Sequence, residues 1–377
     1  MQPVKVLQVN KFYSPVTGGI ETLVKQYSEE LSKYDDIELE VLCCQKERAK
    51  TQIETVNGIK VTRMSSLGTY FSCPLSLSFI REFRRKARNA DVIEIHVPFP
   101  LADFAVTFSR IKGKLFVAWH SDIVKQEKVM FFIKPFMKRL LERANNIIVA
   151  TEGHISGSKY LPSYKEKCIV IPYGIDSSQY NPDSINPEYR SILTEKLTNS
   201  SSRKALFVGR LVYYKGVDVL IKAFGEVHDT ELFICGEGPL ESSLKKLASD
   251  MNMSGKIHFL NYLTDEKLKA AYNDCDFFVL PSVQRSEAFA LVQAEAMIYG
   301  KPVINTNLPS GVPYVSLDKV TGITVTPCDT HELAAAINIL SSDDELRHKY
   351  GDNARERVLN VFNKDKVIEY LHTLFVK

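Results

Sequence analysis

The chain has 377 residues, of which 45% are hydrophobic and 25% charged, a composition that predicts a globular protein with room for two domains of about 150 to 200 residues each. Its net charge of +3 and the lack of an aromatic stacking motif argue against nucleic-acid binding. No apolar run reaches the roughly 18 residues of a membrane-spanning helix, and the first residues lack the regions of a signal peptide, so we expect a cytoplasmic protein.

The first half alternates strand-like and helix-like segments. Helical periodicity appears at 19–34 and 136–144. Near-continuous apolar runs rich in β-branched residues predict buried parallel strands at 4–10, 37–44, 59–64, 91–97, 114–120, 145–151 and 167–174.

The second half repeats this pattern. It follows a stretch rich in Pro, Asn and Ser at 181–203, which predicts a connection between domains. Helical periodicity returns at 217–227 and 265–274. The predicted strands are 204–210, 231–238, 256–263, 276–282, 302–307 and 322–327.

The repeated alternation predicts an α/β protein with two doubly wound domains, residues 1–177 and 178–359. Residues 354–377 are helical by pattern. Ligands are expected at the carboxyl ends of the strands and in the cleft between the domains.

Two glycines, Gly18 and Gly19, lie between the first predicted strand and a helix. Glycine permits close backbone approach, and the N–H groups at a helix start attract phosphate. The spacing matches neither a GxGxxG motif nor a Walker loop. A phosphate contact and a plain tight turn both remain open on these residues alone.

Two cations follow the first strand of the second half. Arg210 ends the strand, and Lys215 lies five residues later, next to Gly216 and just before a helix. A guanidinium offers paired donors and an ammonium a mobile charge, so the pair suits a diphosphate. The alternative is two solvated surface cations.

His120 ends another predicted strand, where α/β sheets place ligands. A lone histidine is more often structural than catalytic, but Ser121 and Asp122 follow this one, and we take it as a site candidate. His96 has a similar position and is the weaker candidate. The chain has no HxH or HExxH spacing, and its seven cysteines have no CxxC spacing, so we expect reduced thiols and no metal.

Glu287 and Glu295 lie eight residues apart in a stretch with little other charge. On one helix they would share a face about 12 Å apart, which suits two contacts to one elongated ligand. A hydroxyl-rich ligand such as a ribose or hexose would satisfy a carboxylate enclosed by apolar neighbours. The alternatives are a helix N-terminal acid with a surface acid, or a glycosidase pair, which this spacing opposes.

Five motifs occur in an order and spacing that resemble the family 4 retaining glycosyltransferases, and the match covers nearly the whole chain. That family has the GT-B fold, in which two Rossmann-like domains face each other across a cleft. The resemblance implies that a C-terminal helix, residues 360–377, crosses back onto the first domain. The motifs are TGGIETLV, VGRLVYYKG, ICGEGPLESSLKKLA, NYLTDEKLKAAYNDCDFFVLPS and PSVQRSEAFALVQAEAMIYGKPVI.

The resemblance implies a catalytic set of His120, Arg210, Lys215 and Glu287. Arg210 and Lys215 would hold the diphosphate of a nucleotide-sugar and stabilise the charge that grows on the leaving group. Glu287 would orient hydroxyls of the donor sugar, and His120 would lie near its anomeric carbon. Glu295 would bind the ribose.

The resemblance also implies backbone contacts with the donor. Gly19 would let the first domain close on the diphosphate, and the base would lie near Gly236 and Leu263. The other residues that it assigns to the donor site are Gly18, Phe289, Ala290 and Leu291.

The implied reaction is transfer with retention of configuration through an oxocarbenium-like state, without a metal ion. The chain departs from the family's Glu-Gly-Phe-Gly, because Ala288 and Ala290 replace both glycines. Alanine disfavours positive φ, so this backbone must be ordinary or strained. A local resemblance to bacterial cell-surface polysaccharide mannosyltransferases makes GDP-mannose the expected donor, and UDP-hexose donors remain open.

The acceptor is expected to be a polyprenyl-diphosphate-linked oligosaccharide, as in O-antigen assembly at the cytoplasmic face of the inner membrane. Residues 1–177 have 26 Lys and Arg against 19 Asp and Glu. Segments 79–91 and 128–144 interleave cations with apolar residues, which suits an anionic membrane surface. The alternative is two helices with buried apolar faces and solvated cations. Neutralising Arg84, Arg85 and Lys86 together should remove the salt dependence of liposome binding.

Two rival classes remain. A sugar-nucleotide epimerase of similar shape would convert its nucleotide-sugar without an acceptor. A non-catalytic scaffold would have no physical need for two cations facing two carboxylates.

Overall fold

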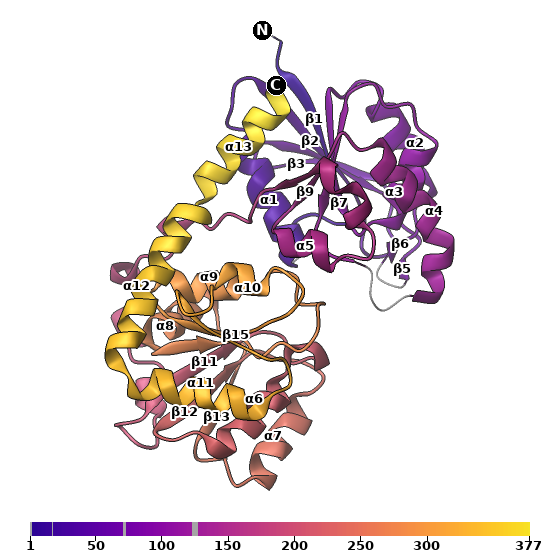
Figure 1. Cartoon of the computed structure of the whole chain (residues 1–377). Helices are drawn as coiled ribbons and strands as arrows, with labels where there is room; N and C mark the ends of the chain where they lie inside the picture. The colour runs from indigo at the N-terminus through magenta and orange to yellow at the C-terminus, as the bar shows by residue number, and fades with distance from the viewer. Residues whose placement is uncertain (1, 17, 71–72, 123–126) are drawn as a thin grey trace. The chain divides into compact units, whose positions relative to one another are not determined.

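An eight-stranded sheet forms the centre of the first of two units, which comprises Met1–Tyr173 and Asp365–Lys377 (Figure 1). The structure is a computed structural model that describes residues 2–16, 18–70, 73–122 and 127–377, without the side chains of 127–130. The strand order is β10-β9-β8-β7-β1-β2-β4-β3. The strands are β1 (Val4–Val9), β2 (Ile37–Cys44), β3 (Gln52–Val56), β4 (Ile59–Met64), β7 (Val92–Val97), β8 (Lys114–Trp119), β9 (Asn146–Val149) and β10 (Cys168–Val170).

Helices cover both faces of this sheet. On one face Phe79 and Phe83 of α2 share a core with Leu140 of α4, and on the other Leu23 of α1 and Leu371 of α13 share a second core. The helices of this unit are α1 (Gly19–Leu31), α2 (Leu77–Lys86), α3 (Pro100–Thr107), α4 (Glu127–Arg143), α5 (Glu152–Gly157) and α13 (Lys364–Val376), and a two-stranded β5 (Thr69–Tyr70) and β6 (Cys73–Pro74) pair lies before α2.

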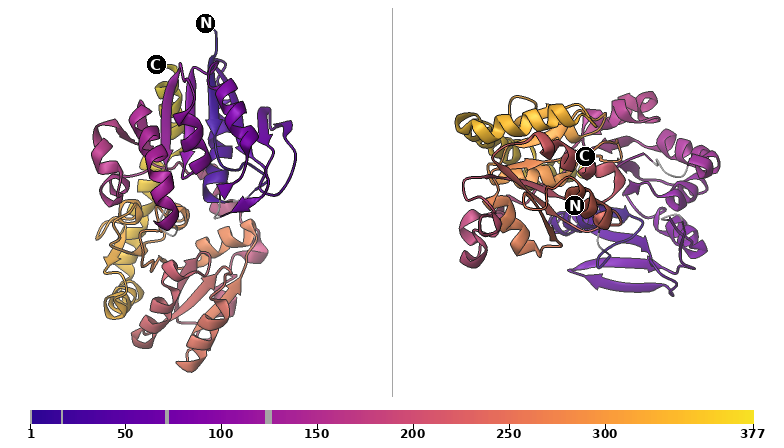
Figure 2. Two further views of the ribbon diagram at one scale, coloured as in Figure 1. Left: turned by 90° about the vertical axis from the view of Figure 1, so that its right-hand side faces the viewer. Right: turned by 90° about the horizontal axis from the view of Figure 1, so that it is seen from below.

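The chain's two ends lie at the same end of the first unit, as Figures 1 and 2 show. α13 reaches this end because Val367, Ile368 and Phe375 are buried against the sheet. His372 on α13 also lies 2.8 Å from an Asp36 carboxylate oxygen just before β2. The C-terminal helix is therefore part of the first unit's core.

The strand β3 is absent from the sequence prediction. It pairs antiparallel with β4 through a tight turn in which Asn57 and Gly58 have φ of 49° and 83°. Asn-Gly between two alternating runs is the strongest short hairpin signal, so the sequence did contain this information.

The second unit, Gly174–Lys364, is built on a six-stranded sheet in which all paired strands are parallel. The strand order is β13-β12-β11-β14-β15-β16. The strands are β11 (Arg203–Val208), β12 (Thr230–Cys235), β13 (Ile257–Asn261), β14 (Phe277–Val279), β15 (Val303–Thr306) and β16 (Gly322–Val325). The helices are α6 (Val217–Ala223), α7 (Glu241–Asp250), α8 (Asp265–Asp274), α9 (Leu291–Ile298), α10 (Val312–Val315), α11 (Thr330–Ser342) and α12 (Asp344–Val361).

Every predicted strand is present, so the doubly wound α/β fold class is confirmed. The prediction of a connection between domains at 181–203 is wrong. This segment belongs to the second unit, where the N–H groups of Leu193 and Thr194 donate to the Asp274 carboxylate at the end of α8.

The chain passes between the units at Tyr173–Gly174 and again at Lys364–Asp365. Next to these passages, Ile175 N–H donates to the Phe362 carbonyl over 2.6 Å, and Lys364 N–H donates to the Ile175 carbonyl over 3.1 Å. A Cβ on Gly174 would lie 2.7 Å from the Lys364 Cα, so only glycine allows this approach. The two passages are therefore paired with each other.

Candidate functional site

The loops that follow β11 and β14 bring Lys215 and Glu287 together in the second unit. The Lys215 Nζ lies 2.6 Å from the Glu287 Oε2, and the Ser282 hydroxyl donates to the same oxygen over 2.9 Å. Only 10% and 9% of the two side chains are exposed. Because β11 and β14 are neighbours in the sheet, residues 72 positions apart in sequence meet here.

Glycines allow these loops to pack backbone against backbone. Gly216, next to Lys215, has φ of +65°, and a Cβ there would lie 2.1 Å from the Pro281 carbonyl oxygen. Gly236, after β12, has φ of +135°, and its Cβ would lie 2.0 Å from the Gly209 carbonyl oxygen. No other residue fits at either position without moving the neighbouring loop.

Arg210 is separate from this pair. Its side chain is exposed, and among the residues that the structure describes it forms no ion pair. The nearby phenol of Tyr214 has its pKa raised by burial and by Glu287, and lowered by Arg210, so both charges act on one small region. The predicted pair of cations thus consists of one buried, paired lysine and one unpaired arginine.

Glu295 lies on α9, whereas Glu287 lies in the loop before that helix. The two carboxylates therefore do not share a helix face, in contrast to the arrangement on one helix that their spacing suggested. The Tyr272 hydroxyl donates to the Glu295 Oε2 over 2.8 Å. Burial raises the pKa of Glu295.

The segment before α9 contains the two alanines that depart from the family motif. Ala290 has φ of 60°, in the left-handed region, whereas Ala288 does not have positive φ. The strain is therefore confined to Ala290. The first turn of α9, from Leu291, has no side-chain cap; the Gln293 N–H donates to the Ala290 carbonyl over 3.0 Å, and the N–H groups of Leu291 and Val292 are suited to an anion.

Phe289 does not present its ring to a ligand. The ring is 3% exposed and packs edge-on against Phe362, with ring centroids 5.8 Å apart. Leu263, in contrast, is partly exposed, and it lies just after Asn261, whose carbonyl accepts from Gly236 N–H over 2.8 Å. Gly236 and the turn that contains Leu263, which were both predicted to lie near the base, are therefore neighbours.

In the first unit, the two predicted glycines stand at the start of α1. Gly18 has an extended φ of 174°, and a Cβ there would meet the Glu21 carboxylate at 2.3 Å. A Cβ on Gly19 would meet nothing within 4 Å. The fold of this unit therefore does not itself require glycine at 19.

His120 directly follows β8 and is 6% exposed. Its Nε2 lies 3.0 Å from the His96 Nδ1, and its Nδ1 lies 2.6 Å from the Tyr173 hydroxyl oxygen. Burial lowers the pKa of His120 to about 3, so the ring is neutral near pH 7. Both ring nitrogens thus already have protein partners, whereas the sequence predicted that this ring contacts a donor sugar.

Sequence reasoning missed the partners of these residues. Gln8 and Glu94 are polar residues inside strongly apolar strands, and Glu94 is two positions from His96, so both face the same side of β7. Buried polar groups need hydrogen-bond partners, so this spacing was a usable signal. Ser282 and Tyr272 gave no such signal.

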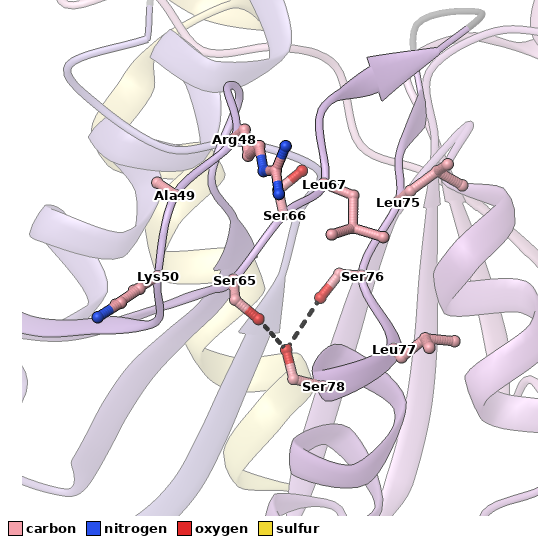
Figure 3. Close-up of a pocket in the computed structure, with 10 residues that line it drawn as sticks. All are labelled: Arg48, Ala49, Lys50, Ser65, Ser66, Leu67, Leu75, Ser76, Leu77 and Ser78. Atoms are coloured by element: carbon pink, nitrogen blue, oxygen red, sulfur yellow. Dashed lines mark hydrogen bonds between the residues drawn. The ribbon is translucent and has the colours of Figure 1, made fainter.

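A cavity of about 620 Å³ opens in the first unit, where β4 ends and α2 begins. The hydroxyl oxygens of Ser65 and Ser78 lie 2.6 Å apart, and Ser76, which caps α2, lies 3.2 Å from Ser78. Figure 3 shows the Arg48 guanidinium directed towards Ser66. The lining residues are Arg48, Ala49, Lys50, Ser65, Ser66, Leu67, Leu75, Ser76, Leu77 and Ser78.

Three leucines give this cavity an exposed apolar border. Leu67, Leu75 and Leu77 are 60%, 50% and 83% exposed. Arg48 is exposed and forms no ion pair within the described part of the chain. The cavity therefore combines hydroxyls, a cation and an apolar surface.

The expectation for Arg84, Arg85 and Lys86 needs correction. Lys86 is 5% exposed and forms an ion pair with Glu40, and Arg85 is paired with Glu82. Substituting all three would therefore disturb packing as well as surface charge. α4 differs, because Phe131 and Phe132 are 79% and 70% exposed. In the second segment, 128–144, the side chains of residues 128–130 lie outside the described residues.

Neither a metal-binding cluster nor a membrane-spanning helix occurs among the described residues. Among them, no group of three or more His, Cys, Asp or Glu side chains is placed to hold a metal ion. No helix among them has the length and apolar character needed to cross a bilayer.

The similarity of this chain to known proteins identifies its class and its family. The model of the family "Glycosyltransferase Family 4" matches residues 17–179, and that of "Glycosyl transferases group 1" matches residues 190–357. The structure is similar to that of HepE from Anabaena in complex with UDP, with a TM-score of 0.80, 18% identity and coverage of 99% and 100% of the two chains. The class of protein is therefore a glycosyltransferase with the GT-B fold.

Full-length relatives narrow the class. The chain is 30% identical to O-antigen chain mannosyltransferase C of Escherichia coli, covering 98% of both chains. It is 31% identical to the D-rhamnosyltransferase WbpZ of Pseudomonas aeruginosa, covering 95% of this chain and 92% of the relative. The chain belongs to glycosyltransferase family 4. This assignment favours transfer to an acceptor over the epimerase and scaffold alternatives.

Proposed function

We propose that the protein transfers mannose from GDP-mannose, with retention of configuration and without a metal ion, to a lipid-linked saccharide in bacterial glycan synthesis. The observation that carries this proposal is the buried Lys215–Glu287 pair at the carboxyl ends of adjacent parallel strands, with the exposed, unpaired Arg210 on the same loop as Lys215. A relative that is an O-antigen chain mannosyltransferase supports mannose.

The diphosphate is held by Arg210, Lys215 and the first N–H groups of α9. Lys215 has three donor hydrogens and uses one towards Glu287, so it can donate to a phosphate oxygen without losing this contact. Arg210 is exposed and supplies a fork of two donors. Both charges oppose the negative charge that grows on the leaving nucleoside diphosphate.

The two carboxylates bind hydroxyl groups. Glu287 receives Lys215 and Ser282 on one oxygen, so among the described residues its Oε1 is left for hydroxyls of the donor sugar. Glu295 uses one oxygen for Tyr272, and the other accepts from the ribose. Glu287 thus orients the sugar relative to the charge that leaves.

Transfer proceeds by departure of the diphosphate and attack of the acceptor hydroxyl on the same face of the sugar. The bond between the anomeric carbon and the phosphate oxygen breaks, and the bond to the acceptor oxygen forms. A phosphate oxygen takes the acceptor proton. Positive charge develops on the sugar in this step, and we expect the negative charge of the Glu287 carboxylate to stabilise it.

The first unit binds the acceptor and a membrane surface. Phe131 and Phe132 are exposed aromatic residues next to Lys134 on α4, a combination that inserts into the interface of an anionic bilayer. The cavity bordered by Arg48 and three leucines fits an acceptor with an anionic head and an apolar chain. The protein is accordingly assigned to the cytoplasm, at the inner face of the inner membrane.

Calorimetric titration with GDP, UDP, ADP and their sugar nucleotides tests the donor, with EDTA present to exclude divalent ions. We expect binding of GDP and GDP-mannose only. Arg210→Ala should weaken it by about tenfold to a hundredfold, the worth of a charge-assisted hydrogen bond. Arg84→Ala, an exposed arginine of the other unit, is the matched control. No nucleotide binding at all would refute the proposal.

A UDP-hexose donor is the second candidate, because the similar HepE structure holds UDP. Binding of UDP species alone in the same titration would establish it. The roles of Arg210 and Lys215 would then stand, while the sugar and the base would change.

The membrane part has its own test. Substituting Phe131 and Phe132 with serine should reduce sedimentation with vesicles of anionic lipid, whereas Leu359→Ser, at an exposed apolar residue of the other unit, should not. Equal sedimentation of all variants would show that α4 does not bind the bilayer.

A further inference from the structure

Five polar side chains of the first unit form an unbroken line of hydrogen bonds across the middle of its sheet. Two of these bonds join His120 to Tyr173 and to His96. Further along, the His96 Nε2 lies 2.7 Å from the Gln8 Oε1, and the Gln8 Nε2 donates to the Glu94 carboxylate over 2.6 Å. The line therefore runs from Tyr173 through His120, His96 and Gln8 to Glu94.

The strand register places these residues. Gln8 of β1 is the direct neighbour of Glu94 of β7, and His96 of β7 is the neighbour of Ala118 of β8, two residues before His120. Gln8, Glu94, His96 and His120 are 1%, 3%, 3% and 6% exposed. A buried polar group without a partner costs about 1–3 kcal/mol, so each bond in the line depends on the next one.

The donor and acceptor of every hydrogen bond in the line follow from Glu94, the residue at its end. An ionised carboxylate can only accept, so Gln8 must present its N–H to Glu94 and its carbonyl oxygen to His96. His96 then donates from Nε2, which leaves its Nδ1 as an acceptor for the Nε2–H of His120. The Nδ1 of His120 in turn accepts from the Tyr173 hydroxyl.

Both histidines have the neutral charge state that this order requires. Burial lowers the pKa of His120 to about 3 and that of His96 well below its ordinary value. A neutral imidazole has one donor and one acceptor nitrogen, and in each ring both are used. Glu94 is two hydrogen bonds further along the line than His96, the direct partner of His120, yet it determines which nitrogen of His120 carries the proton.

We propose that Glu94, Gln8, His96 and Tyr173 are positioning residues that hold His120 as its Nε2–H tautomer and keep its Nδ1 occupied by the Tyr173 hydroxyl. The inference about a ligand rests on the proposed function: the His120 ring can reach a donor sugar through Nδ1 only after Tyr173 has moved away. Tyr173 is the last residue of the first unit before the chain passes to the second.

The space beside these residues agrees with a ring whose Nδ1 is covered by Tyr173. A cavity of about 20 Å³ borders His96, His120 and Tyr173. This is room for about one water molecule and not for a sugar. This cavity therefore gives a sugar no access to the ring, and the Nδ1 of His120 becomes available to a ligand when the Tyr173 hydroxyl leaves it.

The test is nitrogen NMR of protein labelled with ¹⁵N-histidine, because protonated and unprotonated ring nitrogens have well-separated shifts. Spectra are recorded at pH 8, where Glu94, whose pKa burial raises to about 7, is ionised. His120→Gln assigns the signals. We expect His120 protonated at Nε2 and hydrogen-bonded but unprotonated at Nδ1. A ring protonated at Nδ1, or at both nitrogens, would overturn the proposal.

Two variants test the direction of the line. Tyr173→Phe removes one hydroxyl, and it should move the Nδ1 signal of His120 towards that of a free nitrogen while Nε2 stays protonated. Glu94→Gln can donate as well as accept, so it should bring a second His120 tautomer into the spectrum. Tyr164→Phe, in the same unit but outside the line, is the control and should change neither nitrogen.

These spectra are independent of the donor. If GDP-mannose binding fails while the tautomers are as expected, the proposed function is wrong and the positioning role stands. If GDP binds but neither Tyr173→Phe nor Glu94→Gln affects His120, the positioning role is wrong. Should Glu94→Gln not fold, the single-hydroxyl variant still decides the matter.

Discussion

At the scale of single residues, Ala290 is the point where the chain accepts a conformation that its side chain opposes. Its φ of 60° costs an L-residue roughly 1–2 kcal/mol, whereas glycine there loses about 0.5–1 kcal/mol of chain entropy. Ala290→Gly should therefore raise the free energy of unfolding by about 0.5–1 kcal/mol in urea denaturation. Ala288→Gly, without positive φ, should lower it instead. Equal effects would mean that Ala290 is not strained.

A buried carboxyl in the first unit predicts an unusual pH dependence. Asp103 is 2% exposed, its Oδ1 has no hydrogen-bond partner within the described residues, and burial raises its pKa to about 8. The folded state then binds this proton more tightly than the unfolded state, so stability falls as pH rises from the ordinary value of 3.8 to about 8.

Asp103→Asn should remove the contribution of Asp103 to this slope. The variant should gain stability over wild type at pH 8 and little at pH 4, measured by urea denaturation at both values. Glu94 contributes with the same sign over a narrower range, from its ordinary pKa of 4.5 to about 7, so its contribution remains in the variant. An unchanged slope in the variant would show that Asp103 is not buried as a neutral acid.

At the scale of elements, the Lys215–Glu287 pair fastens the loop after β11 to the loop after β14. Removing one member of a buried pair leaves the other without compensation and costs about 3–5 kcal/mol. Lys215→Ala should lower the free energy of unfolding by this amount even without nucleotide. Lys222→Ala breaks a solvent-exposed pair with Asp218, and should cost less than about 0.5 kcal/mol. Equal losses would contradict the buried pairing.

The elements also show what could be predicted. Apolar runs were enough for the strands and the doubly wound class, and the motifs singled out Lys215 and Glu287, whose roles in binding a donor stay predictions. The partners of His120 were not predictable, because they depend on β1, β7 and β8 being adjacent in that order. Lys215 and Glu287 meet for the same reason. The hairpin at Asn57 and Gly58 was missed although its local signal was present.

At the scale of the whole molecule, the last helix stabilises the unit in which the chain begins. Leu371 of α13 is 2% exposed against residues of β1 and α1, so Leu371→Ala should cost about 2–5 kcal/mol in the stability of the first unit. GDP affinity, which is assigned to the second unit, should not change in calorimetry. Leu359→Ala, partly exposed on α12, is the control. A loss of GDP affinity would contradict this separation.

The pairing of the two interunit passages has a consequence for how the molecule comes apart. Cutting one peptide bond at either passage divides the chain into two fragments, which stay together because α13 packs into the core of the first unit. The cut ends also stay aligned, since Ile175 remains hydrogen-bonded to Phe362 and Lys364, and the Lys364 ammonium stays 3.0 Å from the Asp176 carboxylate. A nicked chain would therefore migrate as one particle in its native form and as two fragments once denatured.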